Sequence, residues 1–237
     1  EDGIRDDLVT GVQTCALPIS YRLQDALGAG RGHGERGRVV SSLDSVWEVA
    51  LSQAQLALTR FLEDGRNIEV CTHFSTVLIE AYRRGGHVFS CGNGGSHCDA
   101  LHFAQEMTGR YREDRRALGA IALGEASHLT CVGNDYGFEE IFARQLDALG
   151  RPGDVLIGLS TSGQSENVCR AFAVAREKQI QTVGLLGRDG GRLKNMADLA
   201  IVVPGETSDR IQEMHIKLLH IVIETVERAL FPGNYAS

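Results

Sequence analysis

The feature that most constrains the fold of this chain is an alternation of short apolar runs with helical stretches. The apolar runs cover residues 87–91, 119–123, 154–159, 182–186 and 199–203. The helix candidates between them cover 96–108, 138–149, 165–178 and, shorter, 191–196. Such an alternation is typical of a parallel sheet covered by helices on both faces. We therefore expect an α/β fold, a three-layer α-β-α sandwich around a five-stranded parallel sheet.

Three further helices are expected outside this alternation. Residues 42–62 place apolar side chains on roughly one side of a helix, and residues 67–84 form a second helix that Gly85 and Gly86 end. The last helix, 208–230, is apolar around much of its circumference. A helix with so little polar face is buried, either within the subunit or between subunits.

The chain divides by composition into an unusual start and a long regular part. Residues 1–41 hold seven glycines and show no sustained periodicity, and their start resembles translated sequencing-adapter sequence. We expect a disordered or non-native leader there, with an ordered functional extension as the less favoured alternative. We expect one domain over 42–231 and a short tail over 232–237.

Composition and charge exclude several classes of protein. With 24 basic and 31 acidic residues the net charge is −7, which argues against broad nucleic-acid binding but allows a pocket for one phosphate. The sequence has no apolar run of about 18 residues, so we expect no membrane-spanning helix. The six cysteines are irregularly spaced without a CxxC pair, which indicates reduced thiols in a cytoplasmic protein.

A glycine-rich turn, CGNGG, follows the first apolar run. Gly92, Gly94 and Gly95 let the backbone approach a ligand closely, and the helix that starts near Ser96 offers free N–H groups. In an open parallel sheet, ligands bind beyond the carboxyl ends of the strands. The alternative is a tight turn without a ligand, since the dinucleotide fingerprint GxGxxG is not matched in its usual form.

A hydroxyl-rich loop follows the third apolar run. Ser160, Thr161, Ser162 and Ser165 gather at the start of one helix. Hydroxyl and N–H donors beside a helix N-terminus suit a phosphate monoester, and the lack of a following lysine argues against a nucleoside triphosphate. Helix capping is the alternative, but one hydroxyl is enough for a cap.

Two pairs of polar residues suggest a metal site. His102 and Glu106 stand at i and i+4 and share a helix face, although such a pair is more often a surface contact. Gln212 and His220 lie about two turns apart on the apolar last helix, where unpaired polar groups are unfavourable. Together the four would make an N/O site for zinc. Glutamine is an uncommon ligand, so spacing alone does not establish this site.

Two polar segments lie between the expected elements. The charged run 110–116 is expected to be a solvated loop, with Arg110 nearest to the candidate helix and able to reach a ligand. Asn134 and Asp135 either bond sugar hydroxyls or form a turn.

These segments together resemble the sugar isomerase (SIS) family and, most narrowly, its phosphoheptose isomerase members, over residues 42–231. The strongest matches are CGNGGSHCDALHFAQEMTGRYRE, CVGNDYGFEEIF, GDVLIGLSTSGQSENV and DRIQEMHIKLLHI. The resemblance implies a flavodoxin-like sheet, oligomerisation helices at both ends, and a homotetramer with active sites at subunit interfaces. The leader matches nothing in the family, and the stretch PGETSDR before the last helix is slightly shorter than expected.

The resemblance also implies roles for individual residues. One zinc ion per subunit would be held by His102, Glu106, Gln212 and His220. Glu106 and His220 would be the acid/base residues. Substrate contacts would come from Asn93, Gly94, Gly95, Glu106, Asn134, Asp135, Ser160, Thr161, Ser162, Ser165 and Gln212, with Arg110 and Asp209 near the pocket.

The implied reaction converts sedoheptulose 7-phosphate to D-glycero-D-manno-heptose 7-phosphate through an enediol(ate), at the start of bacterial ADP- or GDP-heptose synthesis. The implied partners are a sugar phosphate and further copies of this chain, with no nucleic acid and no membrane. One alternative is a non-catalytic relative that docks on the replication initiator, but such relatives lack the equivalents of Glu106 and His220. A sugar-phosphate-sensing regulator would need a DNA-binding helix pair, which the sequence lacks.

Overall fold

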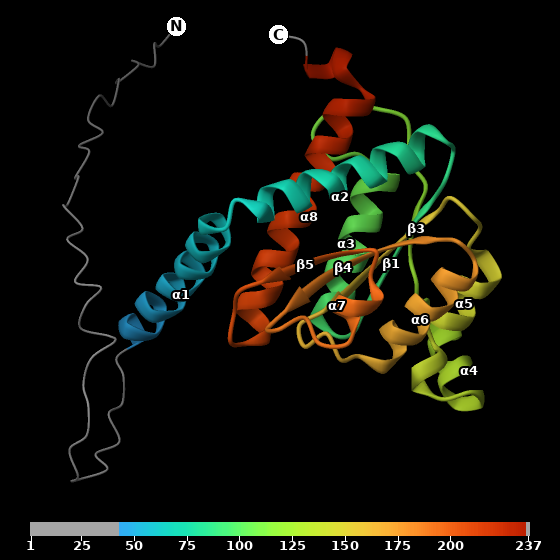
Figure 1. The fold of residues 1–237 in the computed structure, drawn as a ribbon, viewed down its shortest axis with the longest axis horizontal. Helices are drawn as coiled ribbons and strands as arrows, with labels where there is room; N and C mark the ends of the chain where they lie inside the picture. Colours follow the sequence, from blue (N-terminus) through green and yellow to red (C-terminus); the bar gives the residue numbers. More distant parts are fainter. Residues whose placement is uncertain (1–42, 236–237) are drawn as a thin grey trace, which may run out of the picture. The chain divides into compact units, whose positions relative to one another are not determined.

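A five-stranded parallel sheet forms the centre of the molecule (Figure 1). The computed structural model describes residues 43–235, so the predicted leader lies outside the described residues. The strand order is β2-β1-β3-β4-β5, which is the flavodoxin-like order that we expected. The strands are β1 Val88–Gly92, β2 Ala120–Ala122, β3 Val155–Ser160, β4 Gln181–Gly187 and β5 Leu199–Val203.

Helices cover both faces of this sheet, which confirms the three-layer sandwich. One face packs against α2 Arg66–Arg83, α3 Gly95–Thr108 and α8 Ser208–Leu230, and α1 Leu43–Glu63 packs in turn on α2 and α8. The other face packs against α4 Ala126–Asp135, α5 Ala143–Leu149, α6 Glu166–Glu177 and α7 Leu193–Met196. Two short 3-10 helices complete the chain, η1 Phe138–Glu140 and η2 Pro232–Tyr235.

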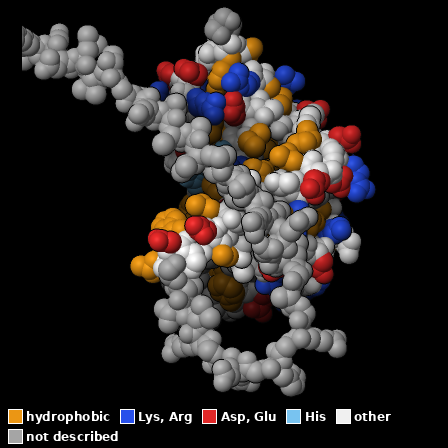
Figure 2. Space-filling view, turned by 90° about the vertical axis from the view of Figure 1, so that its left-hand side faces the viewer, with side chains coloured by type: hydrophobic (Ala, Val, Ile, Leu, Met, Phe, Trp, Pro, Cys, Tyr) orange, Lys and Arg blue, Asp and Glu red, His pale blue; other side chains and the backbone are white. Residues whose placement is uncertain are grey.

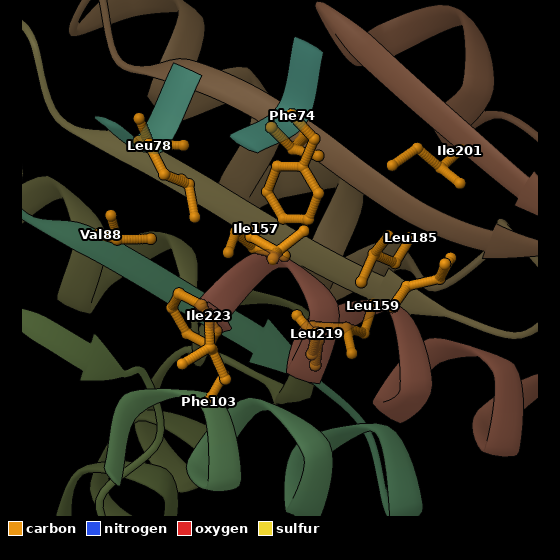
Figure 3. Close-up of a cluster of buried hydrophobic side chains, with 14 of the residues drawn as sticks. Phe74, Leu78, Val88, Phe103, Ile157, Leu159, Leu185, Ile201, Leu219 and Ile223 are labelled. Atoms are coloured by element: carbon orange, nitrogen blue, oxygen red, sulfur yellow. The ribbon is translucent and has the colours of Figure 1, made fainter. Parts of the chain in front are cut away.

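The strands alternate their side chains between the two hydrophobic cores. Along β3, Ile157 and Leu159 point into the core with α2, α3 and α8, while Leu156 points into the core with α6. Figure 3 shows the first of these cores, a cluster that includes Phe74 of α2, Ile157 of β3 and Leu219 of α8. All six residues of β3 are buried, as expected for a central strand covered on both faces.

Two helical elements differ from the sequence expectation. The helix expected over 138–149 is divided into η1 and α5, because Ile141 and Phe142 turn into the core between them. The helix α4 was not predicted, and it buries one side chain only, that of Val132. Its N-terminus is capped by the Glu125 carboxylate, which accepts from the Ser127 and His128 amides, whereas Ser, Thr, Asp and Asn are the usual caps.

The strand order brings the two loops predicted to bind ligands next to each other. Strands β1 and β3 are neighbours with Gly92 paired to Leu159, so the loops that follow them leave the same edge of the sheet. After β1 the chain crosses to β2 at one edge of the sheet, and after β3 it crosses to β4 in the opposite direction. The space between the loops that follow β1 and β3 is therefore the topological switch point, where sheets of this kind bind ligands. Among the described helices, none has the length and apolar character needed to cross a membrane.

Candidate functional site

The turn after β1 is shaped for close approach by a side chain from α8. Gly94 has φ 56° and ψ −123°, a conformation that residues with a side chain rarely adopt. A Cβ atom at Gly95 would lie 2.5 Å from Gln212 Oε1. The absence of a side chain at Gly95 thus leaves room for the Gln212 amide, whose Nε2 donates a hydrogen bond to Ser96 Oγ at 3.2 Å.

A pair of asparagine amides joins this turn to the start of α6. Asn93 Nδ2 donates to Asn167 Oδ1 at 2.9 Å, and Asn167 Nδ2 donates to Asn93 Oδ1 at 2.8 Å. Asn167 is buried, and its Oδ1 also accepts from the Val168 amide. The reciprocal pair therefore fixes the two candidate ligand loops relative to each other.

The loop after β3 is held by its own first hydroxyl. Ser160 is buried, and its Oγ lies 2.9 Å from Ser165 Oγ and accepts from the Gly163 amide at 3.1 Å. Gly163 has φ 64°, and a Cβ atom there would lie 2.0 Å from the Gly190 carbonyl oxygen. Side chains larger than hydrogen are therefore excluded at this point of the loop.

The other two hydroxyls of the loop lie nearer to solvent. Thr161 Oγ1 lies 3.1 Å from Ser208 Oγ at the start of α8, and Ser162 Oγ accepts from the Gln164 amide at 3.2 Å. The N-termini of α6 and α8 thus meet at one polar loop. Hydroxyls and free N–H groups at helix N-termini suit an anion.

Two histidines and a glutamate meet where α3 and α8 pack together. His102 Nε2 lies 2.9 Å from His220 Nε2, and the two rings meet edge to face at 4.9 Å between centroids. His102 Nε2 also lies 3.4 Å from Glu106 Oε1. The predicted i, i+4 pair on α3 and the predicted histidine on α8 therefore share one place.

The surroundings of His220 favour its neutral form. Burial is the main cause that lowers the pKa of His220, and the neighbouring His102 and Lys217 add to the shift. The Glu106 carboxylate opposes it. The ring of Tyr111 stacks on His220 at 5.8 Å with an angle of 25°. One turn before His102, burial raises the pKa of Asp99 to about 6.

An open cavity lies beside His220. Its volume is about 400 Å³, and its walls come from α8 and from the loop after α3, including Tyr111, Arg112 and Ile216. Because the His220 imidazole lies at the wall of this cavity, it can contact a molecule bound there, whereas a histidine buried in the core cannot.

The donor set at this place suits zinc in its chemistry. Two imidazoles and one carboxylate are ligands that zinc binds in proteins. In the structure these side chains contact one another directly. Over residues 43–235, no group of three or more His, Cys, Asp or Glu residues is arranged so that it could hold a metal ion. Gln212, the fourth predicted ligand, is engaged with Ser96 instead.

The remaining predicted residues lie apart from this centre. Arg110 is exposed, and Asp209 is exposed and pairs with Arg210 at 2.9 Å. Asn134 and Asp135 end α4, are exposed, and bond each other at 2.7 Å. Helix α4 packs on the opposite face of the sheet from α3 and α8. In Figure 1 it lies at the lower right, away from α8.

The structure corrects one expectation and adds residues that the sequence analysis missed. The run 110–116 is not wholly solvated, because the Arg115 side chain is 0 % exposed and pairs with Glu227. Tyr111 and Asn167 touch the candidate site residues and were not singled out. The tyrosine lies inside a charged run and the asparagine inside a helix start, so neither carries a signal of its own in the sequence.

The chain is similar to known proteins in both sequence and structure. The SIS domain family matches residues 51–187. A curated phosphoheptose isomerase of Escherichia fergusonii is 51% identical over 181 residues, which are 76% of this chain and 94% of that protein. The solved phosphoheptose isomerase of Neisseria gonorrhoeae has a TM-score of 0.74 at 37% identity, over 78% of this chain and 99% of that one. The solved enzyme of Francisella tularensis has a TM-score of 0.74 at 33% identity, over 79% and 99%.

Proposed function

This chain belongs to the SIS domain family and to its phosphoheptose isomerases, and from that membership we propose that it isomerises sedoheptulose 7-phosphate to D-glycero-D-manno-heptose 7-phosphate. The reaction would begin bacterial ADP- or GDP-heptose synthesis. The observation that carries the proposal is the meeting of His102, Glu106 and His220, with His220 on the wall of a cavity. The two helices that carry them, α3 and α8, begin at the two loops at the switch point of the sheet.

The hydroxyl-rich loop after β3 would bind the phosphate. Ser160, Thr161, Ser162 and Ser165 offer hydroxyls there, and the start of α6 adds free N–H groups and the positive end of its dipole. Asn93, Gly94 and Gly95 of the neighbouring turn would hold the sugar. Fixing both ends of an open-chain sugar places its reacting carbons in one position.

Proton transfer between the first two carbons is the chemical step. The Glu106 carboxylate would remove a proton from C1, and the C–H electron pair would form the C1–C2 double bond of an enediol(ate). The electron pair of the C2 carbonyl would move to O2, which would take a proton from His220. The C1 hydroxyl would then give its proton to His220 as C1 becomes the aldehyde, and C2 would take back the proton held by Glu106. Both groups are of the kind that such steps use.

A zinc ion would be held by His102, Glu106 and His220, with Gln212 as the fourth ligand, one ion per subunit. When bound, zinc would supply positive charge near the oxygen that becomes negative. The support for this ion is the donor chemistry of the three touching side chains and the family of the chain. Glu106 would then serve as base, as ligand or as both.

We also propose a cytoplasmic homotetramer in which a neighbouring copy completes each site. Helix α1 exposes large apolar side chains around much of its circumference, a pattern typical of an interaction surface. They are Leu43, Val46, Trp47, Val49, Leu51, Leu56 and Leu62. Asn134 and Asp135 would contact the sugar bound at another copy, since α4 lies on the opposite face from α3 and α8. The five described cysteines are free thiols, in keeping with a reducing compartment.

The test is an assay with sedoheptulose 7-phosphate together with metal analysis of the purified protein. We expect aldose product and one zinc per chain, with activity lost on chelation and regained when zinc is added. A protein with neither turnover nor zinc would overturn the proposal. Such a result would favour the alternative of a non-catalytic binding module.

A further inference from the structure

A buried charge network joins the C-terminal end of α8 to the loop after α3. The Glu227 side chain is 1 % exposed and the Arg115 side chain 0 %, with Arg115 Nε 2.9 Å from Glu227 Oε1. The Tyr235 hydroxyl donates to Glu227 Oε2 at 2.6 Å. Burial works to raise the pKa of Glu227, but the hydrogen bonds, that from Tyr235 first, outweigh it and lower the pKa. The carboxylate is therefore held charged between two donors.

The same carboxylate lies against the backbone of the loop that walls the cavity. The Tyr111 and Arg112 amides point at the two oxygens of Glu227, each at 3.4 Å. Tyr111 is the residue whose ring stacks on His220. Its amide is thus held at Glu227, and its ring lies over the imidazole about two helical turns earlier on α8.

Arg115 carries the connection into α3. Its Nη2 donates to the Glu106 carbonyl at 2.8 Å, and its Nη1 donates to the Met107 carbonyl at 2.9 Å and the Gly109 carbonyl at 3.1 Å. These carbonyls belong to the end of α3, where no intrahelical partner is available. One guanidinium therefore ties the helix end that carries Glu106 to α8.

We propose that Glu227 is a positioning residue of the isomerase, which with Arg115 and Tyr235 sets the Tyr111 ring against His220 and fixes the end of α3 that bears Glu106. The inference rests on the proposed function. In this proposal Tyr235, near the C-terminus, helps to orient His220 and Glu106 through Glu227, without contacting either residue. A network that acts on orientation changes kcat more than KM, because the phosphate is held elsewhere by the loop after β3.

A double-mutant cycle with Tyr235→Phe tests the connection. Removing this hydroxyl takes one donor from Glu227 and leaves the ring in place. We expect kcat to fall about fivefold with KM changed less than about twofold, because small displacements of catalytic groups have large effects on rate. In a Tyr111→Leu background we expect the same change to lower kcat by less than about twofold, since the ring that it orients is already missing.

Thr225→Val is the matched control. It removes a hydroxyl from the same end of α8 as Glu227, and that hydroxyl donates to the Ile221 carbonyl of its own helix. We expect its kcat and KM to equal those of the unaltered protein. Equal losses of kcat from Tyr235→Phe in both backgrounds, or a loss that appears in KM instead, would overturn the proposal.

Hydrogen exchange gives a second readout that does not depend on turnover. Glu227→Gln and Tyr235→Phe should each speed exchange of the Tyr111 and Arg112 amides at least about threefold, with exchange in the core of the sheet unchanged. Unchanged exchange at these two amides would contradict the proposal. If the unaltered protein lacks turnover but the amides respond, the proposed function fails while the positioning network stands.

Discussion

The side chains that we propose for catalysis are brought together by two helices, each of which supplies part of the set. Helix α3 places His102 and Glu106 on one face, and α8 adds His220 across the contact. The two imidazoles touch at hydrogen-bond distance, so at least one of them is neutral. A neutral imidazole beside a carboxylate provides both a donor and an acceptor for moving a proton.

Glu106→Gln keeps the size of the side chain and removes its basicity. We expect isomerisation to fall by about 10²–10⁴-fold, the usual contribution of a general base, while binding of sedoheptulose 7-phosphate is retained. Turnover assays and isothermal titration measure the two effects. Gln105→Ala, an exposed change at the adjacent position of α3, is the control and should leave both unchanged. Near-normal turnover of the Glu106→Gln protein would refute the assignment.

His215 makes stability depend on pH. It is 0 % exposed and neither ring nitrogen has a hydrogen-bond partner among the described residues. Burial lowers the pKa of His215 to about 4, and the Leu186 backbone opposes the shift without reaching hydrogen-bond geometry. The unfolded chain takes up a proton below about pH 6.5 and the folded chain only below about pH 4, so stability falls as the pH drops between these values.

The expected loss of unfolding free energy from this residue is about 2 kcal/mol between pH 7.5 and pH 5. Urea unfolding at both values, at one protein concentration, measures it. In His215→Leu the fall between the two values should be smaller by that amount. An equal fall in both proteins would show that His215 does not carry this pH dependence.

At the scale of elements, the sequence predicts those strands and helices that are determined by the pattern of neighbouring residues. All five strands were expected within one or two residues, because each is a short apolar run between helical stretches. Helix α4 was missed because it has little apolar periodicity, with Val132 as its one buried side chain. The ion pair of Arg115 with Glu227 joins positions far apart in the chain, and no spacing rule connects them.

The site shows the same division between local and distant information. The spacing of His102 and Glu106 predicts that they share a helix face, and the structure places them 3.4 Å apart. Their meeting with His220 depends on how α3 packs on α8, which the residues alone did not establish. The position of Gln212 beside Gly95 likewise depends on that packing.

The amide pair between Asn93 and Asn167 predicts coupling between the two ligand loops. Asn167→Ala removes both hydrogen bonds and leaves the Asn93 amide unpaired, at a cost of about 1–3 kcal/mol in stability. We expect KM to rise several-fold, about 3–10-fold, because a sugar contact loses its support. Steady-state kinetics measures this. Asn195→Ala, an exposed change on α7, should leave KM unaltered. Equal KM values in the two variants would show that the pair is not needed for substrate binding.

At the scale of the whole molecule, α1 has an apolar surface that the other described residues, up to Tyr235, do not cover. Its buried residues are Ala57 and Phe61 near its C-terminal end, while Leu43 is 82 % and Trp47 69 % exposed. Figure 2 views the side on which α1 lies in Figure 1 and shows hydrophobic side chains gathered there between charged ones. Burying apolar area of this kind is worth about 25 cal/mol per Å², which favours association.

Trp47→Glu should weaken the assembly. A charge on this face must be desolvated on association, so we expect the mass by light scattering to fall from about four times the chain mass toward smaller species. Activity should fall in parallel if a neighbouring copy supplies Asn134 and Asp135. Asn195→Asp adds the same charge at an exposed position of α7, away from α1, and should keep the tetramer. An unchanged mass for Trp47→Glu would exclude this face as the interface.

The internal bonding of the loop after β3 has a consequence for the time course of binding. Ser160 with Ser165, Thr161 with Ser208, and Ser162 with the Gln164 amide are already paired. In the proposed binding mode, a phosphate would therefore meet a backbone already in its bound shape. Its entry would require only rotation of hydroxyl groups, which takes picoseconds to nanoseconds. The rate of substrate binding would then be limited by diffusion and by access to the site, with no slow ordering of the loop before binding.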